Sequence, residues 1–370
     1  MQIRIEKQNL LDGVQRVQNV VDKKNTIPVL ANILFDASQE DNSLKLIATN
    51  LEVGMSTVLP VSETTGGSIT IPAQKLFEIL RELPEATVTL TVDEKNWVTI
   101  ECLKANFRLA GLSKVDFPEL PTLPTQDIVM LPQATLREMI GKTSFAVSHD
   151  ESRYALTGVL FSIGNQELSM VATDGHRLAL IKRPYQLELS GEDAKDVIIP
   201  LKAITEVKKL CETDGSMSIN LGDNQIAFRK EGTMLVSRLI EAQFPDYKQV
   251  IPSDSRFSLV ANREEFSRVL RRVALLCSDT RLVKFHLSEG QLALTSNDPN
   301  LGEAREVMPV EYNGEELTIG FNARYIMDFL SVISGNEVRI GINDSLSPGL
   351  FSSNGDDDTG FACVVMPMRV

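Results

Sequence analysis

The chain has 370 residues, of which 43% are hydrophobic and 24% charged, as in a globular protein of two or three domains. Its formal net charge of −13 opposes binding to nucleic acid unless cations gather on one surface, because phosphate contacts need positive charge. The sequence has no apolar run long enough for a signal peptide or a membrane span, and its four cysteines lie far apart. We therefore expect a cytoplasmic protein without disulfides, metal clusters or bound cofactors.

Residues 1–125 predict a unit with two helices and about eight short strands. Apolar residues at helical spacing cover residues 6–24 and 72–83. Alternating apolar residues predict strands at "ILFDAS", "SLKLIAT", "TVTLTV" and "WVTIEC". The unit closes on "FRLAGLSKVDFPEL", a strand followed by a proline turn, and a Pro/Thr-rich stretch marks its boundary.

The same order of elements occurs twice more along the chain. Helices are predicted at 132–147 and 201–211, then at 262–277 and 321–333. The segments "LKLIATNLEVGM", "VATDGHRLAL" and "LALTSNDPNLGEA" align on Thr49, Thr173 and Ser296 at nearly constant spacing. The sequence therefore predicts three copies of one domain, at residues 1–125, 126–253 and 254–370.

Helices that accompany antiparallel strands place each copy in the α+β class. Similar domains join through similar edges, so one unused edge remains at each end of the chain, and the two edges are complementary. A head-to-tail contact between such edges closes into a ring when the rotation permits. We therefore expect two or more copies of the chain to close into a ring, so that one chain forms half of a ring of two.

Positive charge is concentrated on the predicted helices, which together are net basic although the whole chain is acidic. In the helix at 262–277, Phe266, Val269 and Leu270 follow the spacing of a buried face. Arg268, Arg271 and Arg272 fall on the opposite side of the same helix. A ring lined by such helices would hold duplex DNA through phosphate contacts that carry no sequence information.

Three stretches resemble catalytic or ligand-binding motifs without meeting their requirements. The corresponding turns of the other two repeats contain no histidine at the position of His176. We therefore interpret Asp174 and His176 in "ATDGHRLA" as turn residues. The stretch "NGDDDTG", 354–360, lacks the glutamate of a calcium loop and is expected to be a flexible acidic hairpin tip. The glycines of "TTGGS", 64–68, precede no lysine, which excludes a phosphate loop. We expect no enzymatic activity.

The threefold repetition, "ATDGHRLA", "QFPDY" and the C-terminal "VVMPMR" together resemble the bacterial DNA polymerase III β subunit, the sliding clamp. The resemblance covers the whole chain. It implies a non-catalytic processivity factor, a head-to-tail homodimer that encircles duplex DNA with helices inside and sheets outside. It also implies loading by an ATP-dependent clamp loader, and polymerases and repair proteins that dock through short linear peptides.

The resemblance implies one peptide pocket on each subunit, between the second and third domains. The implied pocket residues are Leu156, Thr173, Gly175, His176, Arg177, Leu178, Pro245, Val250, Asn322, Tyr325, Leu346, Val364, Val365, Met366, Pro367, Met368 and Arg369. Leu, Val, Met and Pro make an apolar cleft, and Arg177 and Arg369 are expected to meet acidic or carbonyl groups of the peptide. Ala155 and Gln249 differ from the aromatic residue and the arginine of some relatives, which leaves the ligand preference open.

The resemblance also implies surfaces for DNA and for the second subunit. With the three arginines of the helix at 262–277, the DNA-facing residues are Lys24, Gln74, Arg81, His149, Tyr154 and Lys202. The implied dimer interface contains Lys75, Phe107, Leu109, Leu275 and Leu276. The alternative is a repeat protein that oligomerises as a protein-binding scaffold and never encloses DNA, which the net charge favours and the basic helices do not.

Overall fold

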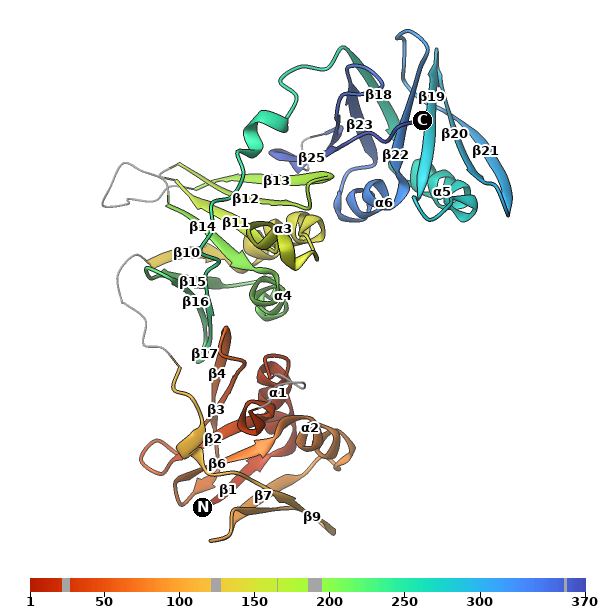
Figure 1. Ribbon diagram of the computed structural model, residues 1–370. Coiled ribbons are helices and arrows are strands. Elements are labelled where there is room, and N and C mark those ends of the chain that lie inside the picture. The colour runs from red at the N-terminus through yellow and green to blue at the C-terminus, as the bar shows by residue number, and fades with distance from the viewer. Residues whose placement is uncertain (22–26, 121–127, 165, 186–194, 356–357) are drawn as a thin grey trace. The chain divides into compact units, whose positions relative to one another are not determined.

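A computed structural model describes residues 1–21, 27–120, 128–164, 166–185, 195–355 and 358–370. The chain divides into two compact units, Met1–Leu136 with Lys202–Leu239 and Arg137–Leu201 with Ile240–Val370. Among the described residues, no helix has both the length and the apolar character that a membrane crossing requires. Figure 1 shows three successive groups of elements along the chain, each with helices and several strands.

Among its described residues, the first group contains two α-helices and nine strands, one of them only two residues long. Its elements are β1 Gln2–Glu6, α1 Lys7–Gln18, β2 Asn32–Ser38, β3 Ser43–Thr49, β4 Val53–Pro60, β5 Glu63–Thr64, β6 Gly67–Pro72, α2 Ala73–Glu82, β7 Thr87–Val92, β8 Trp97–Cys102 and β9 Ala105–Ala110. The four strands predicted from alternation are β2, β3, β7 and β8, as expected. The helix predicted to continue to Lys24 ends at Gln18, and Asn19 is its C-cap.

In the part of the chain that the structure describes, the second and third groups repeat this order with two α-helices and eight strands each. The second contains β10 Ile128–Pro132, α3 Gln133–Thr143, β11 Gly158–Ile163, β12 Glu167–Thr173, β13 Arg177–Pro184, β14 Lys195–Pro200, α4 Leu201–Leu210, β15 Ser216–Leu221, β16 Gln225–Lys230 and β17 Thr233–Arg238. The third contains β18 Phe257–Asn262, α5 Arg263–Val273, β19 Leu282–Ser288, β20 Gln291–Asp298, β21 Gly302–Pro309, β22 Leu317–Asn322, α6 Ala323–Val332, β23 Glu337–Ile342, β24 Gly349–Ser353 and β25 Phe361–Val365.

The helices α3 and α5 end earlier than the apolar spacing predicts. Each continues as a single 3₁₀ turn, Ser144–Ala146 after α3 and Ala274–Leu276 after α5. A 3₁₀ turn tightens a helix end and satisfies part of its unpaired backbone. The faces of α5 are as predicted, with Phe266, Val269, Leu270 and Val273 buried.

Antiparallel pairing joins the described strands into four sheets, and two of these sheets continue from one group into the next. Their strand orders are β5-β1-β7-β8-β9, β10-β15-β16-β17-β4-β3-β2-β6, β14-β11-β12-β13-β25-β24-β23-β18 and β21-β20-β19-β22. The joining pairs are β4 with β17 and β13 with β25. In both junctions the same strand of one repeat meets the last strand of the next, which confirms that similar domains join through similar edges.

Candidate functional site

The segment "ATDGHRLA" forms a hydrogen-bonded turn between β12 and β13. The Asp174 Oδ1 accepts hydrogen bonds from the backbone N–H of His176, at 2.9 Å, and of Arg177, at 3.0 Å. The Thr173 hydroxyl donates to the Arg177 carbonyl at 2.6 Å and accepts from the Gly175 N–H at 3.1 Å. Gly175 has a φ of 86°, which favours glycine. Asp174 and His176 therefore act as turn residues, as the sequence indicates.

The first repeat builds the same turn, and the third repeat does not. The Asn50 side chain accepts from the backbone of Val53 at 2.8 Å, and the Thr49 hydroxyl donates to the Val53 carbonyl at 3.0 Å. The Ser296 hydroxyl instead donates to the Val273 carbonyl at 2.6 Å. There β20 continues past Ser296, and Asp298 caps the turn through the N–H groups two and three residues later.

Arg177, the first residue of β13, is buried, and its side chain is only 7% exposed. Its Nε donates to Asp174 Oδ2 at 3.1 Å, its Nη1 to Asp328 Oδ2 at 2.7 Å and its Nη2 to the Phe145 carbonyl at 2.6 Å. The guanidinium carbon lies 5.3 Å from the ring centroid of Phe145 and 4.5 Å from that of Tyr325. The guanidinium that was expected to meet a peptide thus already bonds to groups of its own chain, and it joins β13 to α6.

A cavity of about 290 Å³ lies beside this turn, and apolar side chains dominate its walls. The predicted pocket residues that line it are Leu156, Thr173, Gly175, Arg177, Leu178, Pro245, Val250, Val364 and Met366. They come from four separate segments: the 3₁₀ turn Glu151–Leu156, the β12–β13 turn, the linker before β18 and the end of β25. The fold therefore brings the predicted apolar cleft together from distant parts of the sequence.

Two further residues, Asp246 and Tyr247, line the same cavity and were not predicted. Tyr247 makes an edge contact with Phe244 at 6.4 Å between ring centroids and packs against the apolar cluster around Leu178. The Asp246 carboxylate accepts from the Gln249 side-chain amide at 2.8 Å. Both residues belong to the quoted "FPDY" motif, so the motif was the signal that could have identified them.

The remaining predicted pocket residues lie outside the cavity lining. They are His176, Asn322, Tyr325, Leu346, Val365, Pro367, Met368 and Arg369. The Tyr325 ring lies against the Arg177 guanidinium. The Asn322 side chain caps α6 by accepting a hydrogen bond from the backbone N–H of Arg324. Val365 is fully buried, and alternation along β25 turns it to the face opposite that of Val364, which lines the cavity. Leu346 is 77% exposed.

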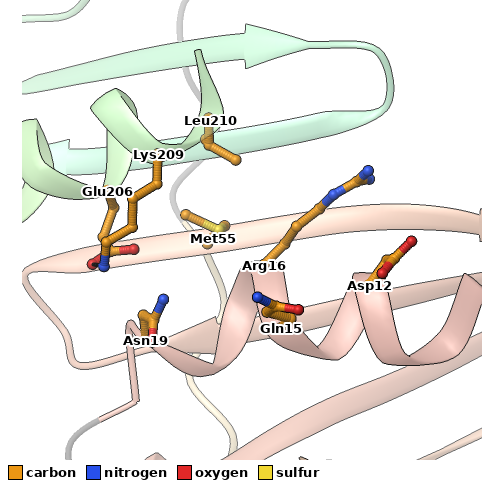
Figure 2. A pocket seen from close by; sticks show the side chains of 8 residues that line it. All are labelled: Asp12, Gln15, Arg16, Asn19, Met55, Glu206, Lys209 and Leu210. Atoms are coloured by element: carbon orange, nitrogen blue, oxygen red, sulfur yellow. Dashed lines mark hydrogen bonds and ion pairs between the residues drawn. The ribbon is translucent and has the colours of Figure 1, made fainter. Parts of the chain in front are cut away.

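A second cavity, of about 320 Å³, lies between α1 and α4. Figure 2 shows its lining residues Asp12, Gln15, Arg16, Asn19, Met55, Glu206, Lys209 and Leu210. Glu206 corresponds to Asp328 in the next repeat, because each is the sixth residue of its helix. Val53 occupies the position of Arg177, as the first residue of β4. The first junction therefore lacks the arginine that bonds to Asp328 at the second junction. Glu206 instead pairs with Lys209 at 2.7 Å.

Many of the predicted DNA-facing groups already contact groups of their own chain. Arg268 pairs with Glu264, Arg272 with Glu306, and the Lys202 Nζ donates to the Val20 carbonyl at 3.2 Å. Gln74 bonds to Glu78 at 3.0 Å, and Arg81 bonds to Glu82 at 3.4 Å. His149, Tyr154 and Arg271 are exposed. Lys24 lies outside the described residues.

The predicted interface residues lie on one edge strand, on one helix and at the end of another helix. Phe107 and Leu109 are on the edge strand β9, and Phe107 is 39% exposed. Leu275, in the 3₁₀ turn after α5, is 78% exposed, and Leu276 beside it is half-buried. Lys75 on α2 pairs with Glu78 at 2.7 Å. The structure thus leaves apolar groups exposed on the first and the third repeat.

Comparison with known proteins matches three consecutive family descriptions to the chain. The N-terminal, central and C-terminal domains of the DNA polymerase III beta subunit match residues 1–121, 130–246 and 248–369. The chain belongs to the bacterial DNA polymerase III β subunit family. It is therefore a DNA sliding clamp of the replicative polymerase, and its family is non-catalytic.

Individual relatives agree over their full lengths. The beta sliding clamp of Chlamydia muridarum is 37% identical over 371 residues, with 100% of this chain and 99% of that protein covered. The crystal structure of the DNA polymerase III subunit beta from Pseudomonas aeruginosa has a TM-score of 0.92 at 35% identity, with 100% of both chains covered. The sliding clamp from Bartonella birtlesii bound to griselimycin has a TM-score of 0.95 at 35% identity and the same coverage.

Proposed function

We propose that two copies of this chain close head to tail into a ring around duplex DNA and tether peptide-bearing partners to it. The observation that supports this most strongly is the pair of edge strands β9 and β21. β9 is the last strand of the first repeat, and β21 is the strand of the third repeat that corresponds to β4 and β13. They are the two partners that the internal junctions would predict for a third junction.

The internal junctions also predict the register of this contact. Gly54, Leu178 and Ala304 occupy one position, opposite the aligned residues Thr49, Thr173 and Ser296. Gly54 pairs with Val236, and Leu178 pairs with Val364.

The paired residues can be followed across the sheet from the first strand of each repeat to its last strand. This places Arg108 at the position that Val236 and Val364 occupy in the other two repeats. Ala304 of one subunit is therefore proposed to lie opposite Arg108 of the other. Phe107 and Leu109 flank Arg108 on the same strand.

The junction between the second and third repeats, where Arg177 bonds to Asp328, supports the placement of Lys75 in the interface. Lys75 is the third residue of α2, as Tyr325 is of α6, and Leu275 is the second residue of its 3₁₀ turn, as Phe145 is. Glu303 corresponds to Arg177, by the register of Ala304 with Leu178. A carboxylate of one subunit is thus proposed to meet the Lys75 ammonium of the other, with exposed Leu275 packed beside them.

The apolar cavity beside Arg177 is the proposed docking site for partner peptides. The side chains of Thr173, Arg177 and Asp246 in its lining are already bonded within the protein. A ligand therefore gains chiefly by burying apolar side chains against Leu178, Val364 and Met366. Griselimycin-bound relatives of the same fold show that such clamps bind a ligand. Polymerases, repair proteins and an ATP-dependent clamp loader are the proposed partners, and the cytoplasm is the proposed location.

Solution mass tests the proposed dimer. Sedimentation of the intact chain should give twice its 40.9 kDa mass. Leu275→Ala with Leu276→Ala should give folded monomers, because truncating two interfacial leucines removes a few kcal/mol of burial. Val115→Ala is a matched control, since Val115 is 84% exposed but lies outside the proposed contact. A dimer that survives the leucine substitutions at nanomolar concentration would contradict this junction.

The alternative scaffold function makes a different prediction for DNA. The basic helices and the family favour the clamp, whereas the net charge favours the scaffold. A scaffold that forms the same dimer would not be retained topologically on circular DNA.

A further inference from the structure

Asp358, in the acidic connection before β25, is anchored in the protein interior. Of residues 354–360, which were expected to form a flexible acidic tip, residues 356–357 lie outside the described part of the chain, and the Asp358 side chain is 0% exposed. Its carboxylate pairs with the Lys142 ammonium of α3, which is only 4% exposed. The sibling hairpins β8–β9 and β16–β17 need only residues 103–104 and 231–232 for the same connection. The longer connection therefore belongs to the third repeat alone.

A network of bonds surrounds this buried ion pair. The other Asp358 oxygen accepts from the backbone N–H of Ser334 at 2.8 Å, next to the end of α6. The Lys142 ammonium also reaches Glu138 at 2.7 Å and lies 5.5 Å from the ring centroid of Phe361, the first residue of β25. Both charges thus have several partners, as buried charges require.

A second cation holds the residues just after Asp358. Arg183 on β13 pairs with Glu138 and donates to the Thr359 carbonyl at 2.5 Å. The Lys182 N–H donates to the Gly360 carbonyl at 2.9 Å. Gly360 has a φ of 77°, and a Cβ there would lie 2.7 Å from the Lys182 carbonyl oxygen. The chain therefore enters β25 at one fixed point along β13.

The register of β25 decides which side chains reach the peptide cavity. β25 pairs with β13 from Phe361 opposite Ile181 to Val365 opposite Arg177. Val364 and Met366 then line the cavity. A slip by one residue would exchange the two faces of the strand and bring Val365 to the cavity instead.

The hydrophobic pattern of β25 does not define this register by itself. Its sequence, "FACVV", is apolar at every position, and both Val364 and Val365 are buried. A strand buried on both faces can exchange them at little cost in apolar burial. A shifted strand would, however, separate Asp358 from Lys142 and leave a buried charge without its partner, which is strongly unfavourable.

We propose that Lys142 and Asp358 are positioning residues that fix the register of β25 on β13 and thereby place Val364 and Met366 in the peptide cavity. This proposal rests on the proposed function of that cavity. It deepens that function because it assigns the shape of one cavity wall, at the end of β25, to a buried ion pair just before the start of β25.

The test neutralises both charges together in the full-length protein. The double variant Lys142→Met with Asp358→Leu leaves no unpaired charge, and replacing a buried pair by apolar groups is often neutral for stability. The matched control is Lys230→Met with Glu212→Leu, which removes a 2.7 Å ion pair at the corresponding hairpin before β17. Griselimycin is the probe, with affinity measured by calorimetry and amide exchange measured at residues 361–366.

The double variant should keep its melting temperature, bind griselimycin about tenfold more weakly and exchange the β25 amides about tenfold faster. The control should change neither affinity nor β25 exchange. Unchanged affinity and unchanged β25 exchange in the double variant would overturn the positioning role. If that variant does not fold, Lys142→Gln with Asp358→Asn, which keeps a hydrogen bond across the gap, is judged by the same two readouts.

The two proposals fail in different ways. Absence of griselimycin binding to the unaltered protein would contradict the proposed function of the cavity. The exchange of β25 amides does not depend on any ligand, so it still decides whether the ion pair holds the strand.

Discussion

The side chain of Leu120 lies directly against Gly54: a Cβ built on Gly54 would be 2.2 Å from the Leu120 Cδ2. Gly54 is the counterpart of Leu178, and Leu120 of "FPEL" corresponds to Tyr247 of "FPDY". At the first junction the linker residue thus occupies the space next to the junction strand. At the second junction Leu178 stands at the position of Gly54, and Tyr247 lines the cavity.

Gly54→Ala should therefore destabilise the first junction by about 1 kcal/mol, because the new methyl group overlaps the end of the Leu120 side chain, which must move aside. Urea unfolding measures the loss. The double variant Gly54→Ala with Leu120→Ala should recover part of it, since the second truncation makes room for the first. Strictly additive losses would show that the two side chains do not compete for one space.

The register inferred for the subunit junction predicts a disulfide. Ala304→Cys with Arg108→Cys should crosslink two chains on mild oxidation, because residues directly opposite on antiparallel strands have Cα atoms about 4.5–5.5 Å apart. Glu306→Cys with Arg108→Cys, two residues out of register, is the matched control. Efficient crosslinking of the control pair, visible as a dimer band without reductant, would rule out the inferred pairing.

Two arginines of α5 are expected to contribute unequally to retention on DNA. Arg268 already pairs with Glu264, whereas no ion pair of Arg271 is found among the described residues. Arg271→Glu should therefore weaken retention on DNA in rising salt more than Arg268→Glu does, because only the former removes an uncompensated charge. Retention can be followed on circular DNA over a salt series. Equal effects would indicate that the Arg268–Glu264 pair opens when DNA is bound.

The buried ion pair also predicts a specific response to acid. Burial raises the pKa of Asp358, but bonds from Lys142 and from the Ser334 amide outweigh it, so this pKa lies below its ordinary value of 3.8. A carboxylate with a lowered folded-state pKa stabilises the fold above its ordinary pKa and loses that contribution as pH falls through the folded value.

The unfolding free energy of the unaltered protein should therefore fall more steeply between about pH 5 and about pH 3 than that of the Lys142→Met, Asp358→Leu variant. Urea unfolding at both pH values measures the difference. Equal pH dependence would mean that the Asp358 carboxylate gains nothing from its partners in the folded state.

The repeated architecture follows from local sequence patterns. Alternation in segments such as "SLKLIAT" and the helical spacing of Phe266, Val269 and Leu270 predict the strands and the buried helix faces, because each pattern depends on near neighbours. The aligned Thr49 and Thr173 turns are predicted for the same reason, since their side chains bond to adjacent backbone.

What the sequence does not show are contacts between distant segments. The sequence predicts that Arg177 binds a ligand, because it does not reveal that Phe145 and Asp328, from other elements of the chain, bond to this side chain. Asp358 lies in an acidic run that is typical of solvent-exposed loops, and only the folded structure places Lys142 beside it. The charge of Arg272 is likewise compensated by Glu306 on a neighbouring strand.

Enclosure of DNA is tested most directly by cutting the DNA. The protein, placed on a nicked circular plasmid by a clamp loader with ATP, should remain bound through moderate salt and leave when a restriction enzyme linearises the plasmid. A closed ring can slide off a free end, whereas an electrostatic contact depends on salt and not on topology. Retention that is unchanged by linearisation, or absent on the intact circle, would contradict a ring of two chains around the duplex.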